Sequence, residues 1–380
     1  EHESLGMHAE LHHRPLGTIG VISPWNGPII LSCMPLASIF SAGNRAMIKP
    51  SEFAPATATL LEQLVTANFD PSELAVINGD WQVAAAFAGL PFDHLLYTGS
   101  SRVAREVLKA AAENLVPVTL ELGGKCPVII GSGTPLDLAA RRIVFGKLFH
   151  GGQVCVSPDY VFVPAGQMQG FTCAVETAVA EMYPDLEGSA DYSPIVNSSH
   201  YQRLQDLITD AREQGTQILQ LGSDPGRSEC RNALRFPFHL LLDPPEQTRA
   251  MHEELFGPIM VIKQYQQMGE AISYVRDHPK PLAGYFFGDD KQELALFLDT
   301  IQTGSVAIND VVCQIFYEQI PFGGIGPSGS GRYRGVAGFR AFSNAMPVLT
   351  QAGSDGHLAP LRPPYGSGIS DFLDQQIRVF

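Results

Sequence analysis

Residues 17–27, with the sequence GTIGVISPWNG, decide the fold of this chain. The segment 17–23 is a short apolar run rich in β-branched residues, which is typical of a buried strand, and it ends in a turn that contains Pro24, Asn26 and Gly27. The residues from about 31 to 42 then have the length of a helix, closed by Gly43-Asn44. A strand, a loop and a helix in this order begin a parallel βαβ unit.

The same alternation continues to residue 122. We predict strands at 45–49, 74–78, 94–97 and 118–122, and helices at 56–67, 83–88 and 101–112. Beyond Gly123-Gly124 the pattern begins again with 127–130, 145–150 and 160–163, and it continues to about Phe322. Because a chain of 380 residues is too long for a single hydrophobic core, we expect two α/β domains, the first of them doubly wound. The last thirty residues, rich in Gly and Pro, should lie outside the core.

The composition narrows the possible partners. The chain has 39 acidic and 25 basic side chains, so its net charge of −14 disfavours nucleic acid and anionic membranes. No stretch approaches the roughly 18 apolar residues of a membrane span, and we expect a soluble, cytoplasmic protein. The cysteines show no spacing typical of a disulfide framework or a metal site. They are Cys33, Cys126, Cys155, Cys173, Cys230 and Cys313.

Polar side chains follow the first two predicted strands. The carboxyl ends of parallel strands are where such folds bind ligands. Asn26 could donate a hydrogen bond to an oxyanion, or its amide could satisfy the backbone of a turn. Lys49 and Glu52 could bind ribose hydroxyls, or they could belong to a solvated loop in which Ser51 caps the next helix.

Two glycine-containing segments could contact phosphates. Gly99 and Ser100 lead into the predicted helix at 101–112, whose N-terminus could hold a pyrophosphate. Residues 324–329 match GxGxxG letter for letter, but they lack the flanking strand and helix and a suitably spaced acid. We therefore reject them as a dinucleotide fingerprint and expect their glycines to let a loop pass close to another backbone.

Two further segments carry reactive residue types. Glu121 ends a buried strand, where a desolvated carboxylate has a raised pKa and can act as a general base; a capping or ion-paired glutamate is the alternative. Cys155 follows the pair Gly151-Gly152, which permits close backbone approach, and it could be a nucleophile or a small buried apolar residue. Downstream, Glu254 and Phe256 precede a Gly-Pro turn, which could equally be an ordinary turn.

These motifs, taken together and in order, resemble the aldehyde dehydrogenase superfamily. The resemblance extends from about Pro15 to Leu349. It rests on PWN, KPSE, TGS, ELGGK, GQVC, EELFGP and PFGGIGPSG. The flanking residues 152–160, 331–335 and 338–339 are similar to the class 3 and coniferyl aldehyde dehydrogenase branch.

The resemblance implies a role for each candidate residue. Cys155 would attack the aldehyde, with the oxyanion held by Asn26 and the Cys155 backbone N–H, and nicotinamide would oxidise the adduct to a thioester. Glu121 would activate the hydrolytic water. The remaining candidates would bind NAD, or alternatively NADP. Lys49 and Glu52 would bind the adenine-side ribose, Gly99 and Ser100 the pyrophosphate, Glu254 the nicotinamide ribose, and Phe256, with Trp25 from PWN, the nicotinamide region.

The resemblance also implies a domain plan. The expected NAD(P)-binding domain is 14–123, the catalytic domain 124–325, the oligomerisation elements of a homodimer 1–13 and 339–350, and the C-terminal tail 351–380. Members usually carry a further N-terminal helical segment, which this sequence does not contain; a naturally short chain and a partial one both remain open.

Two residues depart from the family pattern. Gly27 replaces the usual aromatic residue after PWN, and we expect a wider entrance for bulky, aromatic aldehydes. Cys126 replaces the common serine, a conservative change. Three other activities stay open: a non-catalytic scaffold or binding protein, a CoA-acylating or phosphorylating dehydrogenase, and a cysteine hydrolase. The presence of Glu121 favours hydrolysis by water.

Overall fold

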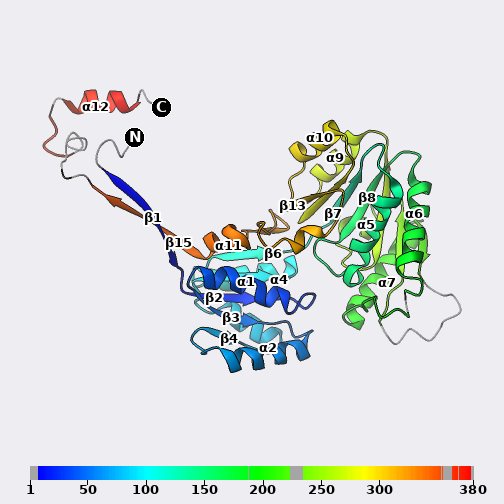
Figure 1. The fold of residues 1–380 in the computed structure, drawn as a ribbon, viewed down its shortest axis with the longest axis horizontal. Helices are drawn as coiled ribbons and strands as arrows, with labels where there is room; N and C mark the ends of the chain where they lie inside the picture. The colour runs from blue at the N-terminus through cyan, green and yellow to red at the C-terminus, as the bar shows by residue number, and fades with distance from the viewer. Residues whose placement is uncertain are drawn as a thin grey trace. The chain divides into compact units, whose positions relative to one another are not determined.

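The computed structural model describes residues 7–186, 188–222, 234–351, 353, 362–366 and 368–377. Cys230 and residues 1–6 therefore lie outside the described residues, as does most of 351–361. The described chain divides into two compact units, one formed by residues 16–342 and the other by the two terminal segments. The first unit contains two large sheets (Figure 1).

The first sheet has six strands in the order β14-β6-β5-β2-β3-β4. All neighbours are parallel except β14, which is antiparallel to β6. The strands are β2 (Thr18–Ile22), β3 (Arg45–Lys49), β4 (Leu74–Val76), β5 (His94–Thr98), β6 (Val118–Glu121) and β14 (Gly329–Ser330). The helices that belong with this sheet are α1 (Ile30–Ser41), α2 (Pro55–Asn68), α3 (Trp81–Ala88), α4 (Ser101–Ala112) and α11 (Gly335–Ala341).

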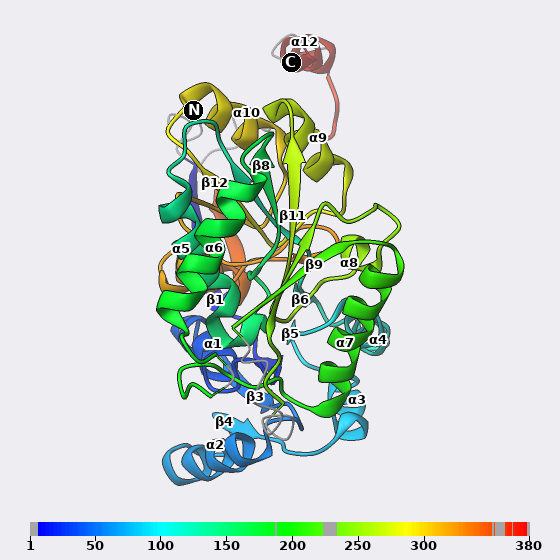
Figure 2. The ribbon, with the colours of Figure 1, turned by 90° about the vertical axis from the view of Figure 1, so that its right-hand side faces the viewer.

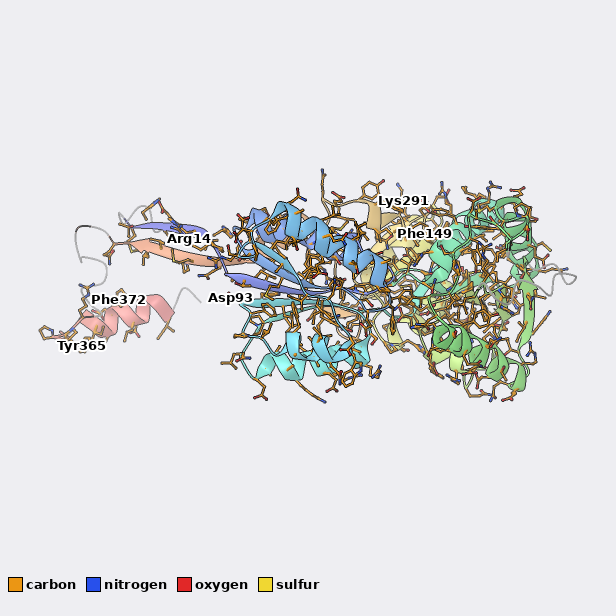
Figure 3. All side chains as sticks on the ribbon, turned by 90° about the horizontal axis from the view of Figure 1, so that it is seen from below. Arg14, Asp93, Phe149, Lys291, Tyr365 and Phe372 are labelled. Atoms are coloured by element: carbon orange, nitrogen blue, oxygen red, sulfur yellow. The ribbon has the colours of Figure 1, made fainter. Side chains whose placement is uncertain are left out.

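Helices cover both faces of this sheet. Apolar residues of α1 and α2 pack into one hydrophobic cluster with β2 and β3, whereas those of α3 and α4 form a separate cluster with β5 and β6. Such burial on both faces explains why the strands are apolar throughout instead of alternating. The prediction of a doubly wound α/β domain is confirmed. At the amino ends of β5 and β2, Asp93, labelled in Figure 3, accepts a hydrogen bond of 2.7 Å from the Thr18 N–H.

The second sheet has seven strands in the order β13-β12-β7-β8-β11-β10-β9. Only β9 runs antiparallel to its neighbour. The strands are β7 (Cys126–Ile130), β8 (Pro158–Pro164), β9 (Gln217–Leu221), β10 (Phe238–Leu242), β11 (Ile259–Tyr265), β12 (Ala283–Phe287) and β13 (Ser305–Ile308). Over this sheet, two helices lie side by side in Figure 2, α5 (Leu136–Leu148) and α6 (Met168–Met182). The other helices of this part of the chain are α7 (Ser198–Glu213), α8 (Arg249–His252), α9 (Met268–Asp277) and α10 (Lys291–Thr300). Two 3-10 helices, Phe149–Gly152 and Cys313–Phe316, complete this part of the chain.

The sequence pattern predicted most of these elements within a few residues. The predicted segment 145–150 is the end of α5 and the following 3-10 helix. The strand predicted at 74–78 ends at Val76, although the Ile77 N–H still donates a 2.8 Å hydrogen bond to the Ile48 carbonyl; the Asn78 side-chain amide bonds to the Ala58 carbonyl and the Glu62 carboxylate. The domain boundaries at 14, 123 and 325 remain a prediction.

The terminal unit contains a two-stranded antiparallel sheet. In it β1 (His8–Pro15) pairs with β15 (Ser343–Thr350) along its whole length, from His8 opposite Thr350 to Pro15 opposite Ser343. The helix α12 (Gly368–Ile377), which the sequence did not predict, also belongs to this unit.

The expectation that the oligomerisation strand begins near residue 339 is wrong. Residues 335–341 form the helix α11 in the larger unit. Gly338 lies so close to α1 that a Cβ there would be 2.3 Å from the Ser38 Oγ. This helix-to-helix contact fixes the segment as a helix, and β15 begins after it.

None of the helices in the described ranges combines the length and the apolar character that crossing a membrane requires.

Candidate functional site

The loop before Cys155 is built from three consecutive left-handed residues. His150 has φ 53°, Gly151 φ 62° and Gly152 φ 73°. A Cβ on Gly152 would lie 2.4 Å from the Gly257 carbonyl oxygen, so only glycine lets the two backbones approach this closely. The predicted close approach at the glycine pair is confirmed. It joins the Cys155 loop to the Glu254–Gly257 loop.

Cys155 is half-buried at the end of this loop. The backbone of the next residue, Val156, is held in place by a 2.6 Å hydrogen bond that the Tyr285 hydroxyl donates to its carbonyl oxygen. Burial raises the pKa of the Cys155 thiol to about 12, the charges of Glu121 and Glu254 add to this, and the Cys155 backbone N–H opposes it. Cys155 is thus neither a fully buried apolar residue nor an ionised thiol in the resting protein.

The Asn26 side chain is directed at the cysteine loop. Its Nδ2 donates a 3.0 Å hydrogen bond to the Gln153 carbonyl oxygen. Gln153 in turn anchors the loop through its side chain, which bonds to the Pro194 carbonyl and to the Val196 N–H. Since a side-chain amide has two N–H groups, Asn26 both binds the loop backbone and retains a donor. This bond goes to a distant loop and not to the backbone of the turn that contains Asn26, and the oxyanion role stays a prediction.

Glu121 is a buried carboxylate. It ends β6, where it pairs with Gly329 of β14, and its side chain is 2% exposed. Within the described part of the chain neither carboxylate oxygen has a hydrogen-bond partner. Burial raises the pKa of Glu121 to about 8, and the guanidinium groups of Arg332 and Arg334 oppose this shift. The predicted rise of the pKa is borne out, and the side chain is not a helix cap.

Glu254 and Phe256 lie on the loop that contacts Gly152. The Gly124 N–H donates a 3.0 Å hydrogen bond to the Glu254 Oε1. Burial raises the pKa of Glu254 to about 7. Phe256 has a left-handed φ of 44°, which is costly for a residue with a Cβ, and its ring meets the Trp25 indole edge-on at 5.6 Å. This turn is therefore not an ordinary one.

Trp25 has a second ring contact that the sequence did not reveal. The His200 imidazole, in the first turn of α7, lies edge-on to the indole at 5.2 Å. Trp25 therefore joins Phe256 and His200 in one cluster of aromatic rings.

Lys49 and Glu52 differ in exposure. Lys49 is 1% exposed, and its Nζ donates a 2.7 Å hydrogen bond to the Pro50 carbonyl, whereas Glu52 is exposed. Burial lowers the pKa of Lys49, and the charges of Glu52 and Asp80 oppose this. The lysine is therefore not part of a solvated loop. The expectation that Ser51 caps the next helix is wrong, because its Oγ accepts from the Phe53 N–H in a turn and α2 begins only at Pro55.

Ser100 is the N-cap of α4. Its Oγ accepts a 3.4 Å hydrogen bond from the Val103 N–H, and the first turn of the helix leaves further N–H groups for an anion. Gly99 has no room for a side chain, because a Cβ would be 2.3 Å from the Tyr97 hydroxyl. A helix N-terminus, a buried lysine beside an exposed acid, and a cluster of aromatic rings are a set of groups that fits a dinucleotide.

The GxGxxG segment does not lead into a helix. It leads into β14, where a Cβ on Gly329 would lie 2.2 Å from the Leu120 carbonyl oxygen. A Cβ on Gly324 would lie 1.9 Å from the Ser328 carbonyl oxygen. The prediction that these glycines serve close backbone approach is confirmed.

Several charged residues near the site were not singled out from the sequence. The Asp159 carboxylate and the Arg203 guanidinium both bond to the backbone of the Glu254 loop, and Lys147 forms an ion pair with Asp159. The charge of Arg334 opposes the rise in the pKa of Glu121 and of Cys155. The one indication of Asp159 and Arg334 in the sequence is that both lie in the segments that flank the motifs. Lys147 had the opposite signal, since a lysine in a helix is ordinarily exposed.

Comparison with known proteins gives a consistent result. The model of the "Aldehyde dehydrogenase family" matches residues 2–348. The chain is 45% identical over 379 residues to a probable coniferyl aldehyde dehydrogenase of Caulobacter vibrioides, covering 98% of this chain and 77% of that protein. It is 42% identical to the coniferyl aldehyde dehydrogenase of a Pseudomonas species, covering 97% of this chain and 76% of that protein.

A solved structure agrees with these relatives. The substrate-bound state of AldH from Staphylococcus aureus superimposes with a TM-score of 0.88 at 34% sequence identity, covering 98% of this chain and 79% of that one.

The burial of Glu121 predicts a pH-dependent effect of a neutral replacement. Its folded pKa of about 8 exceeds the ordinary value of 4.5, so between these pH values the folded chain keeps a proton that the unfolded chain has lost. Stability of the parent protein therefore falls as pH rises through this window and levels off above it.

Glu121→Gln has no proton to lose, so its stability relative to the parent should rise by on the order of 3 kcal/mol between about pH 5 and pH 8. Thermal unfolding of both proteins across this range measures the effect. Two curves that run parallel would contradict it.

Proposed function

Because the chain belongs to the aldehyde dehydrogenase family, we propose that its NAD(P)-dependent oxidation of an aldehyde to the carboxylic acid proceeds through a thioester on Cys155. The observation that carries this proposal is electrostatic. The half-buried Cys155 thiol is near enough to the buried Glu121 carboxylate for the charge of Glu121 to raise its pKa. A nucleophile and a general base are thus neighbours in one desolvated site.

In the first step the Cys155 thiol loses its proton to water, and the resulting thiolate attacks the aldehyde carbon and forms a thiohemiacetal as the carbonyl π bond opens. The negative charge develops on the former carbonyl oxygen, and the second N–H of the Asn26 amide and the Cys155 backbone N–H stabilise it there. The hydrogen bond from Asn26 to the Gln153 carbonyl supports this role, because it holds the amide beside the cysteine loop before substrate binds.

In the second step the thiohemiacetal carbon loses a hydride and becomes a thioester. When bound, the oxidised nicotinamide supplies the hydride acceptor. Glu121 in its ionised form then takes a proton from water, the resulting hydroxide attacks the thioester carbon, and the C–S bond breaks to release the acid and free Cys155. A carboxylate with a pKa of about 8 and no hydrogen-bond partner among the described residues is suited to hold that proton.

The residues for the cofactor come from four elements. Lys49 and Glu52 would bind the adenine-side ribose, and Gly99 and Ser100 at the start of α4 the pyrophosphate. Glu254 would bind the nicotinamide ribose, and Phe256 and Trp25 would support the ring. The edge-on contact of Trp25 with Phe256 and the N-cap of α4 by Ser100 support these assignments.

The substrate proposed is a bulky aromatic aldehyde of the coniferyl type. At Gly27 no side chain extends from the backbone. The 3-10 helix Cys313–Phe316 is tied to the Cys155 loop, because Gln314 donates to the same Tyr285 hydroxyl that bonds to Val156. Its exposed Phe316 ring meets Phe149, labelled in Figure 3, at 6.2 Å. Exposed aromatic rings of this kind suit an aromatic substrate.

We further infer a homodimer formed through β1 and β15. A two-stranded sheet is marginally stable in isolation, and in the described chain β1 and β15 pair only with each other. Sedimentation equilibrium that finds a monomer would exclude this. A cytoplasmic location is likewise a prediction.

The thioester is tested by trapping it. With NAD+ and aldehyde, Glu121→Gln should slow hydrolysis by roughly 10²- to 10⁴-fold, so that an acyl group accumulates on Cys155 and mass spectrometry finds it there. In the Glu121→Gln background, Cys155→Ala should neither reduce NAD+ nor carry the acyl group, whereas the control Cys173→Ala, at an exposed cysteine, should do both. Turnover of the parent protein that requires CoA and yields no free acid without it would favour a CoA-acylating enzyme instead.

The width of the entrance is tested at Gly27. Gly27→Tyr should lower kcat/KM for a cinnamaldehyde-type substrate roughly tenfold more than for acetaldehyde. Gly27→Ala is the matched control, since its Cβ would lie 3.0 Å from the Ile30 Cγ2 and adds no ring. Equal losses on both aldehydes in the tyrosine variant would show that Gly27 does not set the width.

The proposed preference for NAD over NADP depends on Glu52, whose charge repels a 2′-phosphate. Glu52→Gln should raise kcat/KM with NADP by roughly tenfold relative to that with NAD. Steady-state kinetics with both cofactors measures the ratio. A ratio equal to that of the parent protein would argue against a role of Glu52 at the ribose.

A further inference from the structure

A buried carboxylate connects the two loops of the site. Asp159 is 2% exposed, and it lies on β8, four residues after Cys155. Its two oxygens accept hydrogen bonds of 3.3 and 3.2 Å from the Leu255 N–H, between Glu254 and Phe256. The strand that follows the cysteine loop therefore holds the middle of the neighbouring loop directly.

Two ammonium groups flank this carboxylate. Lys125 Nζ lies 3.3 Å from Asp159 and also donates to the Ala250 and Glu253 carbonyls, at 2.8 and 3.0 Å. Lys147 Nζ, on α5, lies 3.7 Å from the other Asp159 oxygen. The Lys147 side chain is completely buried, and its ammonium group makes no hydrogen bond within the described ranges, so Asp159 is its neutralising partner.

The loop is held from its other side as well. The Arg203 guanidinium donates to the carbonyl oxygens of Glu254 and Leu255, at 3.2 and 2.6 Å. Phe256 keeps a strained left-handed φ of 44°, which persists only where the surroundings impose it. The surroundings that impose it are Asp159, Lys125 and Arg203.

We propose that Asp159 and Lys147 are positioning residues: the Lys147 charge holds the Asp159 carboxylate in place, and Asp159 fixes the loop of Glu254 and Phe256 against the Cys155 loop. This rests on the proposed function only in that Glu254 and Phe256 bind the cofactor. The position of the loop itself can be measured without cofactor.

A role in positioning accounts for a buried pair better than a role in stability. A buried ion pair is seldom more stable than an apolar replacement of similar volume. Removing one partner, in contrast, leaves the other charge buried and unpaired. The proposal therefore predicts that each of the two single substitutions lowers the Tm more than the substitution of both residues together does.

The experiment uses Trp25, whose indole contacts the Phe256 ring at 5.6 Å. The chain has two tryptophans, and Trp81→Phe, at a residue 68% exposed on α3, leaves Trp25 as the only one. In this background Asp159→Asn retains the shape and one acceptor for the Leu255 N–H but removes the charge. We expect acrylamide to quench Trp25 roughly twofold more efficiently in this variant, because Phe256 no longer keeps its position.

Lys147→Met and the double variant complete the design. Both single variants should have a lower Tm than the background. The double variant should recover part of the loss in Tm, because it leaves no unpaired charge buried, but not the loss of Trp25 protection, because it still lacks the Asp159 carboxylate that holds the Leu255 N–H. NAD+ titration is a separate readout, with Kd expected to rise roughly tenfold in Asp159→Asn. Glu181→Gln is the control, because it neutralises an ion pair with Arg141 in which both side chains are 52% exposed.

The outcomes separate the two proposals. More efficient quenching with an unchanged Kd supports the positioning of the loop and contradicts the cofactor roles of Glu254 and Phe256. Unchanged quenching in Asp159→Asn, or a double variant no more stable than that single variant, overturns the positioning proposal. A Glu181→Gln protein that loses as much Tm as Lys147→Met would also overturn it.

Discussion

The exclusion of water from Glu121 is the interaction on which the chemistry of this site depends. A carboxylate at the end of a central strand would ordinarily face solvent or a cationic partner. Here β14 crosses the end of β6 with Gly329 opposite Glu121, and both carboxylate oxygens lack a partner within the described chain. An unsolvated carboxylate resists ionisation, and the result is a pKa of about 8. A group that is half-ionised near pH 8 can both take up and release a proton.

This exclusion of water is possible because backbone, rather than side chains, fills the space around the site. Gly329 approaches the Leu120 carbonyl, and Gly152 approaches the Gly257 carbonyl, at distances that no Cβ allows. Each contact joins segments far apart in sequence. Glycine thus has the same function in two unrelated loops.

The sequence predicted the two sheets and the residues at their strand ends, because buried parallel strands and turn residues leave clear local patterns. Glu121, Lys49 and Ser100 stand where those patterns end. The pairing partners of these residues left no such pattern. The order of the strands, the helix at 335–341 in place of a strand, and the bond of Asn26 to Gln153 all depend on contacts between distant segments. Lys147 was unpredictable for the same reason, since its partner Asp159 lies on another element.

Three acidic groups share one desolvated site, and this imposes an order on the proposed reaction. Cys155, Glu121 and Glu254 all have raised pKa values, and the charges of both glutamates disfavour the thiolate. Like charges in a medium of low dielectric constant cannot all ionise together, so the three groups titrate as a coupled set. The thiolate forms most readily while Glu121 is protonated, whereas hydrolysis of the thioester needs Glu121 ionised. The two half-reactions thus require opposite states of one carboxylate. Acylation itself supplies the change, because it removes the thiolate charge next to Glu121 and so allows that carboxylate to ionise when water must be activated.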